Sequence, residues 1–280
     1  MIVSLLLVAC GSPTGGDSGS PFPADPPLII GGTRPAVVVV PSNYTTDKEW
    51  PLVMLLHGYG ANSTLQDGLL GLSAHAESLG FILVKPEGTT DSDGAQFWNA
   101  TEECCDFEHN GVDDVAYIGG LVEEAHTLYP ISRVVFVGHS NGGYMSYRMA
   151  CDRPDLMDKM AILAGAVYKD EADCKGTTPM NLLHIHGTAD DTVAYESDDT
   201  HAGAEESVGR WVTKAACGAP TGAGTHDYLS TADGEETSVQ QWGGCADDVD
   251  IQLWTALDGD HIYLGNNAAF KDDLAGWMME

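Results

Sequence analysis

Ser140 lies in a five-residue segment, Gly138-His139-Ser140-Asn141-Gly142, whose composition suits a reactive serine. The apolar residues before it, Val134 to Val137, predict a short buried strand, and the run from Tyr144 to Ala150 is compatible with a helix. G-x-S-x-G between a strand and a helix is the pattern of a nucleophile elbow, a strained turn that lifts the serine hydroxyl clear of the sheet. We therefore predict that Ser140 is a nucleophile. A glycine-rich turn with an incidental serine is the alternative.

A serine hydroxyl becomes a good nucleophile only when a base removes its proton and a carboxylate orients that base. On an elbow of this kind the acid and then the histidine follow the serine along the chain. Asp190 comes soon after the predicted strand Leu182 to Ile185 and can reach an imidazole over the elbow. Asp191 is its rival, unless it caps the turn or faces solvent. The residues alone leave both carboxylates open.

His261 is the best candidate for the base among the ten histidines. It follows the last predicted strand, Ile251 to Ala256, on a loop that contains Gly259. The remaining histidines come too early in the chain, or lie in the polar segment between residues 194 and 244, or lie within or beside predicted strands. The last group is expected to pack in the core or to fix loops, and it comprises His57, His139, His184 and His186.

Two main-chain N–H groups are needed to stabilise the oxyanion of a tetrahedral intermediate. Asn141, directly after the nucleophile, supplies one, and the loop after an early strand supplies the other. That loop is His57-Gly58-Tyr59-Gly60, so Tyr59 is the expected second donor, although a β-turn without function is the alternative. We expect the Tyr59 ring to lie along a bound acyl group and Trp98, in a polar loop, to stack on substrate. A position in the core is the alternative for Trp98.

The charge of the chain is strongly acidic, since 12 basic residues face 42 acidic ones and leave a net charge of -30. Nucleic acid is excluded as a partner because so few basic side chains cannot neutralise phosphates. Excess negative charge destabilises a compact state by self-repulsion, and salt screens that repulsion. We therefore hypothesise a salt-tolerant protein from a saline habitat. An ordinary soluble secreted protein is the alternative.

The first 27 residues differ in composition from the rest. An apolar run, Ile2 to Ala9, ends in Leu7-Val8-Ala9-Cys10, which resembles a bacterial lipobox, although no Lys or Arg precedes it. Residues 1–10 are thus predicted to be a lipoprotein-type signal segment, too short to span a bilayer, with Cys10 as a lipid anchor. Residues 11–27 are predicted to be a disordered linker and 28–280 a single catalytic domain. The protein is expected to be exported, either as a cell-envelope lipoprotein or as a secreted protein.

Predicted strands and helices alternate along the catalytic domain. This alternation predicts an α/β fold with a doubly wound, mostly parallel sheet and helices on both faces. The predicted strands are 36–40, 52–56, 81–85, 134–137, 160–163, 182–185 and 251–256, and the predicted helices are 64–79, 113–128, 141–151, 204–216 and 267–279, with a small hairpin between residues 194 and 244.

Six cysteines remain when Cys10 is set aside, and an even number in an exported protein favours disulfides. We prefer a Cys217–Cys245 bond, because these residues flank the polar segment. The other four would tie the Cys104-Cys105 loop to the segments near Cys151 and Cys174. A zinc site is the alternative, but the spacing of a structural zinc site is missing.

Several motifs together resemble the polyhydroxybutyrate depolymerase/feruloyl esterase group of α/β-hydrolases over nearly the whole chain after Leu28. They are Gly58 with its preceding strand, Pro86-Glu87-Gly88-Thr89, Phe97-Trp98-Asn99-Ala100, Cys104-Cys105-Asp106, Val112-Asp113-Asp114-Val115, Gly138-His139-Ser140-Asn141-Gly142-Gly143, His186-Gly187-Thr188-Ala189-Asp190 and Gly259-Asp260-His261. The doubled Asp190-Asp191, the lipobox and the acidity depart from many members of the group.

The resemblance implies an α/β-hydrolase fold and a triad of Ser140, Asp190 and His261, with Tyr59 and Asn141 as oxyanion donors. It favours Asp190 over Asp191 as the acid. It further implies a serine esterase that is active, without cofactor or metal, on polyesters such as polyhydroxyalkanoate or poly(ethylene terephthalate), or on feruloyl or acetyl esters. We expect a monomer. A peptidase or acyltransferase with the same triad, and an inactive polymer-binding protein, are the alternatives.

Overall fold

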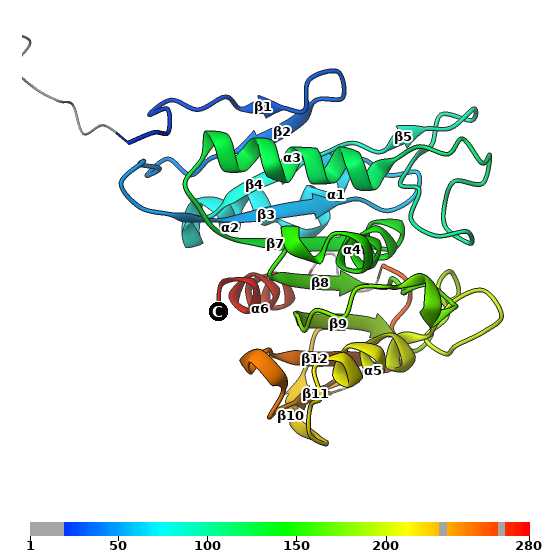
Figure 1. The fold of residues 1–280 in the computed structure, drawn as a ribbon. Helices are drawn as coiled ribbons and strands as arrows, with labels where there is room; N and C mark the ends of the chain where they lie inside the picture. The colour runs from blue at the N-terminus through cyan, green and yellow to red at the C-terminus, as the bar shows by residue number, and fades with distance from the viewer. Residues whose placement is uncertain (1–19, 230–233, 263–266) are drawn as a thin grey trace, which may run out of the picture.

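The computed structural model describes residues 20–229, 234–262 and 267–280 (Figure 1). The predicted signal segment, Cys10 and the first part of the predicted linker lie outside these residues. Among the described residues, no helix has both the length and the apolar character needed to cross a membrane.

A sheet of ten strands forms the centre of the described residues. Its spatial order is β1-β2-β4-β3-β7-β8-β9-β12-β11-β10. Six neighbouring strands, from β4 to β12 in this order, are parallel, whereas β1, β2, β11 and β10 pair antiparallel at the two edges. The strands are β1 (Ile29–Ile30), β2 (Ala36–Val39), β3 (Trp50–Leu56), β4 (Ile82–Lys85), β7 (Ile131–His139), β8 (Lys159–Leu163), β9 (Asn181–Gly187), β10 (Pro220–His226), β11 (Thr237–Trp242) and β12 (Ile251–Ala256).

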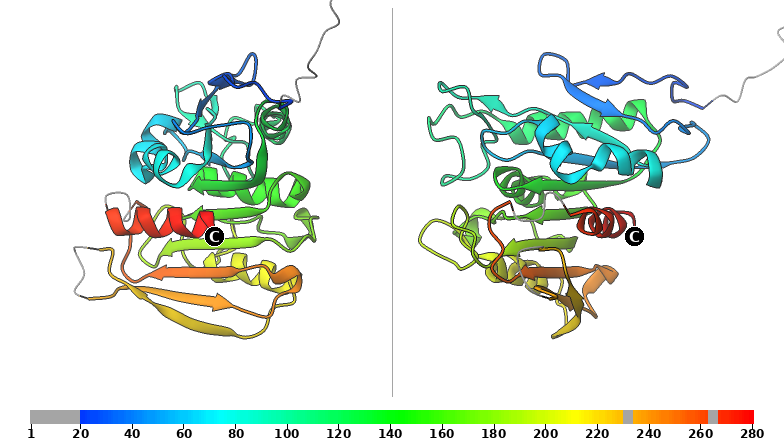
Figure 2. Two further views of the ribbon diagram at one scale, coloured as in Figure 1. Left: turned by 90° about the vertical axis from the view of Figure 1, so that its left-hand side faces the viewer. Right: turned by 180° about the vertical axis from the view of Figure 1, so that it is seen from behind.

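Helices cover both faces of this sheet, so the doubly wound, mostly parallel architecture is confirmed (Figure 2). Alternate residues of a strand point to opposite faces. Leu52, Met54 and Leu56 of β3 belong to one hydrophobic core with α3, α4 and α5, while Val53 and Leu55 belong to a second with α1, α2 and α6. The helices are α1 (Ser63–Leu70), α2 (Leu72–His75), α3 (Asp114–Leu128), α4 (Asn141–Asp152), α5 (Ala204–Lys214) and α6 (Ala268–Met279).

Short elements complete the fold. A separate pair of strands, β5 (Thr89–Thr90) and β6 (Gln96–Phe97), precedes α3. The remaining short helices are the π-helix η1 (Ala76–Gly80) and the 3-10 turns η2 (Pro154–Leu156), η3 (Glu171–Asp173) and η4 (Ala246–Asp248).

The single helix predicted for residues 64–79 is wrong, because the structure breaks it at Gly71. Gly71 has a φ of 69° and ends α1 in the left-handed conformation that a glycine adopts without strain. The hairpin predicted between residues 194 and 244 is confirmed. Strands β10 and β11 form it, and it extends the central sheet next to β12.

Three disulfides join the six cysteines of the described residues. Cys217–Cys245 is bonded as predicted. The prediction for the other four is wrong, because Cys151 bonds to Cys174 and the neighbours Cys104 and Cys105 bond to each other. The loop around Cys104 is therefore not tied by a disulfide to α4. It contacts α4 through a hydrogen bond, since Asn141 Nδ2 lies 3.4 Å from Cys104 Sγ.

Candidate active site

Ser140 occupies the sharp turn between β7 and α4. Its φ is 55° and its ψ is -124°, which is unusual for a residue with a side chain and is typical of a strained functional turn. The Ser140 main-chain N–H donates to Leu163 O at 2.8 Å, so the turn is fixed to the end of β8. The half-buried side chain lies at the carboxyl ends of the parallel strands, where open α/β sheets bind their ligands.

The start of α4 packs directly against the end of β3. A Cβ added at Gly142 would lie only 2.1 Å from Leu56 O, so no larger residue fits at this position. The loop that follows β3 is therefore held beside the elbow, and a Cβ added at Gly58 would lie 3.3 Å from Ser140 Cβ. Among the hydrogen bonds of the described residues, none uses the main-chain N–H of Tyr59 or Asn141. Both donors are thus free to bind an anion at the N-terminus of α4.

His261 and Asp190 form a close pair although they are 71 residues apart in the chain. His261 Nδ1 lies 2.7 Å from Asp190 Oδ2. Because an ionised carboxylate can only accept, His261 Nδ1 carries the hydrogen, and in the neutral imidazole Nε2 is then the free acceptor. The loops that carry the two residues touch at their glycines, since a Cβ added at Gly187 would lie 2.1 Å from Gly259 O.

The Asp190 carboxylate is buried and fully engaged. Its Oδ1 accepts from the main-chain N–H groups of Thr192 at 2.9 Å and Val193 at 2.8 Å. Burial raises the pKa of Asp190, but hydrogen bonds from His186, His261 and the Val193 N–H outweigh burial, so the pKa lies well below its usual value. Asp191 is exposed, and the one hydrogen bond of its carboxylate within the described part of the chain comes from the neighbouring Thr192 hydroxyl, at 3.4 Å. Of the two adjacent carboxylates, the structure brings only Asp190 to His261.

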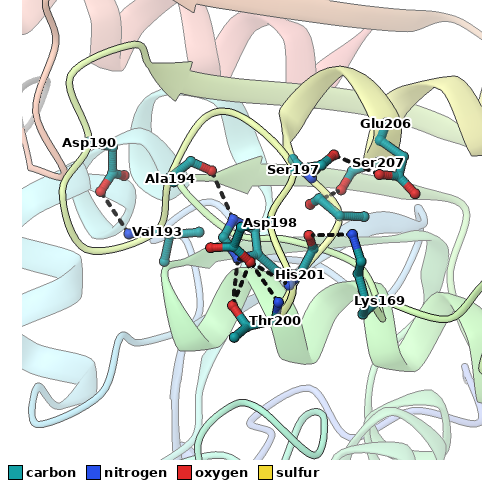
Figure 3. A network of polar contacts seen from close by, with 12 residues as sticks. Lys169, Asp190, Val193, Ala194, Ser197, Asp198, Thr200, His201, Glu206 and Ser207 are labelled. Atoms are coloured by element: carbon teal, nitrogen blue, oxygen red, sulfur yellow. Dashed lines mark hydrogen bonds and ion pairs between the residues drawn. The ribbon is translucent and has the colours of Figure 1, made fainter.

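The loop that follows Asp190 is held by its own polar contacts (Figure 3). Asp198 Oδ1 accepts from the Thr200 N–H at 2.7 Å and from the His201 N–H at 3.1 Å. The buried His201 ring donates from Nε2 to Ala194 O at 2.9 Å. At the far end of the loop, Ser197 Oγ donates to Glu206 of α5 at 2.6 Å. These contacts fix the return path of the chain between Ala194 and α5.

His139 places His261 beside the elbow. The His139 ring nitrogen Nε2 donates to His261 O at 3.0 Å, and the two ring centroids are 5.0 Å apart. His261 therefore lies against the residue that precedes Ser140. Among the described residues, Ser140 Oγ makes no hydrogen bond to His261. Such contacts are often long in structures without substrate and shorten when substrate binds.

Of the two residues predicted to contact substrate, Trp98 takes a different position from the one expected. Its side chain is fully buried, and its Nε1 donates to His57 O at 2.9 Å. A ring that is covered on all sides offers no face to a substrate. Tyr59 is exposed over 41% of its surface, and its ring packs edge-on against Phe107 at 5.4 Å. Tyr59 and Phe107 thus form an exposed aromatic surface at the loop of residues 57–60, called the oxyanion loop below.

Two residues that lie at the site were not predicted to belong to it. Phe107 is 62% exposed and lies in a polar loop without periodicity, so no sequence signal marked it. His186, expected only to pack or to fix a loop, lies 3.3 Å from Asp190 Oδ2. The spacing of His184 and His186 was a usable signal, because residues two apart on a strand share a face.

Comparison with known proteins agrees with this architecture. The chain is 26% identical over 259 residues to feruloyl esterase B of Piromyces equi, in an alignment that covers 87% of this chain and 44% of the relative. It is 25% identical over 244 residues to feruloyl esterase D of Neurospora crassa, covering 83% and 75%. The chain spans less than half the length of the first curated relatives that it matches.

Solved structures show the same fold. An acetyl xylan esterase from Aspergillus awamori superposes with a TM-score of 0.65 at 16% identity and covers 88% of this chain and 94% of its own. A family model described as "alpha/beta hydrolase fold" matches residues 51–192. The matched region contains β3 from Pro51 onward, the elbow and Asp190, and it makes up slightly more than half of the chain. The chain therefore belongs to the alpha/beta hydrolase fold family.

Proposed function

We propose that this protein is a serine carboxylic ester hydrolase that works through an acyl-enzyme. Ser140 is the nucleophile, His261 the general base and Asp190 the carboxylate that orients it. The observation that carries the proposal is the 2.7 Å contact between His261 Nδ1 and Asp190 Oδ2, which leaves His261 Nε2 as the acceptor beside the strained Ser140 turn. The esterase names of the relatives support the same reaction class.

The acylation step follows from the geometry. His261 Nε2 takes the Ser140 hydroxyl proton while Oγ forms a bond to the ester carbonyl carbon, and the carbonyl π electrons move to oxygen. The N–H groups of Tyr59 and Asn141 donate hydrogen bonds to this negatively charged oxygen. When the C=O bond re-forms, the bond to the leaving oxygen breaks, and His261 gives that oxygen the proton. An alcohol leaves, and the acyl group stays on Ser140.

Deacylation repeats these steps with water in place of the serine. His261 removes a proton from the water as it attacks the acyl carbon, and the second tetrahedral intermediate collapses with release of Ser140. The protonated imidazole returns the proton to Oγ. Asp190 remains ionised throughout and offsets the positive charge of the imidazolium. This scheme uses no metal and no cofactor.

For the substrate we propose an ester with an aromatic or polymeric component. Feruloyl and acetyl esters of plant polysaccharides are supported by the names of the relatives, which include an acetylxylan esterase/xylanase of Neocallimastix patriciarum. The exposed Tyr59 and Phe107 rings beside the oxyanion loop would favour a planar aromatic acyl group. Parallel assays would rank the acyl groups by their rates of hydrolysis, with ethyl ferulate, acetylated xylan, hydroxybutyrate polymer and terephthalate oligomers as substrates.

We also propose that the protein is exported as a monomer, secreted or anchored through a lipid on Cys10. The three disulfides of the described residues support an oxidising compartment. Incorporation of labelled palmitate into the full chain, and its loss in Cys10→Ser, would test the anchor. Equal labelling of both chains, or none, would contradict it, and light scattering would give the oligomeric state.

The central test is Ser140→Ala, compared with Ser132→Ala, which changes an exposed serine on the same strand. Ser140→Ala should abolish hydrolysis of p-nitrophenyl butyrate and labelling by a fluorophosphonate, with an unchanged circular dichroism spectrum. Ser132→Ala should retain both. Hydrolysis that survives in Ser140→Ala would refute the proposal. Cleavage of peptides but not esters would indicate a peptidase, and polymer binding without turnover an inactive binding protein.

A further inference from the structure

A chain of buried polar side chains lies behind Asp190. Tyr147 OH of α4 is 2.7 Å from His184 Nδ1, and His184 Nε2 is 3.1 Å from His186 Nδ1. His186 Nε2 is 2.8 Å from Val193 O and 3.3 Å from Asp190 Oδ2. Tyr147, His184 and His186 are fully buried. Buried polar groups are stable in a core only when each one has a hydrogen-bond partner. This hydrogen-bonded chain of Tyr147, His184 and His186, called the relay below, ends at the Asp190 carboxylate that contacts His261.

The hydrogens of this relay have one consistent arrangement. His186 Nε2 faces two acceptors, Val193 O and Asp190 Oδ2, so it must carry a hydrogen. In a neutral ring its Nδ1 is then an acceptor, which requires His184 Nε2 to donate. His184 Nδ1 is in turn an acceptor, and Tyr147 OH donates to it. Burial lowers the pKa of His184 and raises that of Tyr147, in agreement with an uncharged relay.

We propose that His186 is a positioning residue for the Asp190 carboxylate. Its Nε2–H holds the main chain at Val193, whose own N–H binds Asp190 Oδ1, and it contacts Asp190 Oδ2 directly. Asp190 Oδ2 is thus shared by two imidazoles. The relay fixes the orientation of His186, whereas His261 is free to accept and return a proton at Nε2. The inference rests on the proposed function, because it assumes that Asp190 orients a catalytic His261.

The contact between His186 and Asp190 has a measurable consequence for the acidic limb of the pH profile of kcat/KM. A carboxylate oxygen that loses one donor attracts its remaining donor more strongly, which favours the protonated form of His261. Loss of the His186 N–H should therefore move the acidic limb of kcat/KM to higher pH. The titratable and charged groups that face the relay are His184 on β9, Asp190 and Tyr195 in the following loop, His139 on β7, Tyr147 on α4 and Arg210 on α5.

The test is His186→Phe, which keeps a planar ring and removes the donor. We expect kcat to fall about 10- to 100-fold, the effect of losing one hydrogen bond to a charged group. KM should change little, and the acidic limb should move to higher pH. His186→Gln, which can place an amide N–H near the position of Nε2, should restore most of kcat and the original limb. If His186→Phe does not fold, Tyr147→Phe should shift the limb in the same direction by a smaller amount.

His201→Phe is the matched control. His201 is also buried in this region and donates from Nε2 to a main-chain oxygen, Ala194 O, but it does not contact Asp190. It should lower the melting temperature without moving the acidic limb. Two outcomes would overturn this inference and leave the proposed function standing. One is an equal shift of the acidic limb in His201→Phe. The other is an unshifted acidic limb in a folded His186→Phe that still reacts with fluorophosphonate. Activity that persists in Ser140→Ala would instead refute the proposed function.

Discussion

The side-chain amide of Asn141 bonds to the main chain of Trp98 in both directions. Oδ1 accepts from the Trp98 N–H at 2.7 Å, and Nδ2 donates to Trp98 O at 2.8 Å. The Trp98 indole then donates to His57 O, one residue before Gly58. A single buried tryptophan therefore connects the two segments whose N–H groups we propose as oxyanion donors. The spacing between these donors depends on contacts made by side chains that never touch the substrate.

Asn141→Ala tests this connection, because it removes the amide and keeps the main-chain N–H. The buried Trp98 N–H would lose its partner, whereas Trp98 O would keep the Cys105 N–H at 3.3 Å. One unsatisfied buried main-chain group costs about 1–3 kcal/mol. We expect the free energy of unfolding to fall by about 1–3 kcal/mol in urea titrations, with a lower kcat and a nearly unchanged KM. A variant as stable and as active as the parent protein would show that the 97–105 loop holds its position without Asn141.

Asp190→Asn and Asp191→Asn form a matched pair of substitutions at adjacent positions. An amide at Asp190 can donate as well as accept, so it no longer fixes the Nδ1–H tautomer of His261. We expect kcat to fall by about 10⁴-fold in Asp190→Asn, the loss that follows when the triad carboxylate of a serine hydrolase becomes an amide. The exposed Asp191 should tolerate the change with full activity. A large loss in Asp191→Asn with activity retained in Asp190→Asn would reverse the assignment of the acid.

The local features of this fold could be predicted from the sequence, because each depends on a short stretch of chain. β12 begins and ends at the predicted residues, Ile251 and Ala256, and the strand–turn–helix pattern around Ser140 is observed. A buried strand and a glycine-containing turn are visible in the sequence without knowledge of what packs against them.

Features that depend on distant contacts could not be predicted in this way. Trp98 looked like a loop residue available to substrate, but the partner that buries its main chain, Asn141, is 43 residues away. The pairing of Cys104 with Cys105 was missed for a different reason, since the bond is local but no sequence pattern distinguished it from longer ones. His186 was recognised as a strand histidine, but its contact with Asp190 is set by the course of the intervening loop.

The acid sensitivity of the protein should depend in part on His139. Burial lowers the pKa of His139 from 6.5 to about 4. The unfolded chain therefore binds a proton at higher pH than the folded protein does. The stability linked to the neutral ring is fully present above pH 6.5 and is lost as the pH falls toward 4.

His139→Gln removes this titration while its amide can still donate to His261 O. The difference in unfolding free energy between the parent protein and this variant should change by about 3 kcal/mol between roughly pH 7 and pH 4, with the parent protein losing more. Urea titrations at matched pH values measure it. Parallel pH profiles for the two proteins would mean that His139 does not contribute to acid unfolding.

Salt should stabilise this protein, because the described ion pairs use only a small part of its negative charge. Partly exposed basic side chains such as Arg148 and Arg153 are paired with carboxylates, but 42 acidic residues face only 12 basic ones. Surface ion pairs contribute about 0–1 kcal/mol each, so weakening them with salt removes little stability. Shortening the Debye length from about 10 Å at 0.1 M to about 3 Å at 1 M removes most of the repulsion among unpaired carboxylates.

We therefore expect the melting temperature to rise and esterase activity to persist between roughly 0.1 M and 1 M NaCl. Sucrose at matched osmolality is the control for solvent exclusion. A steady fall of both quantities with NaCl would show that the excess charge does not control stability.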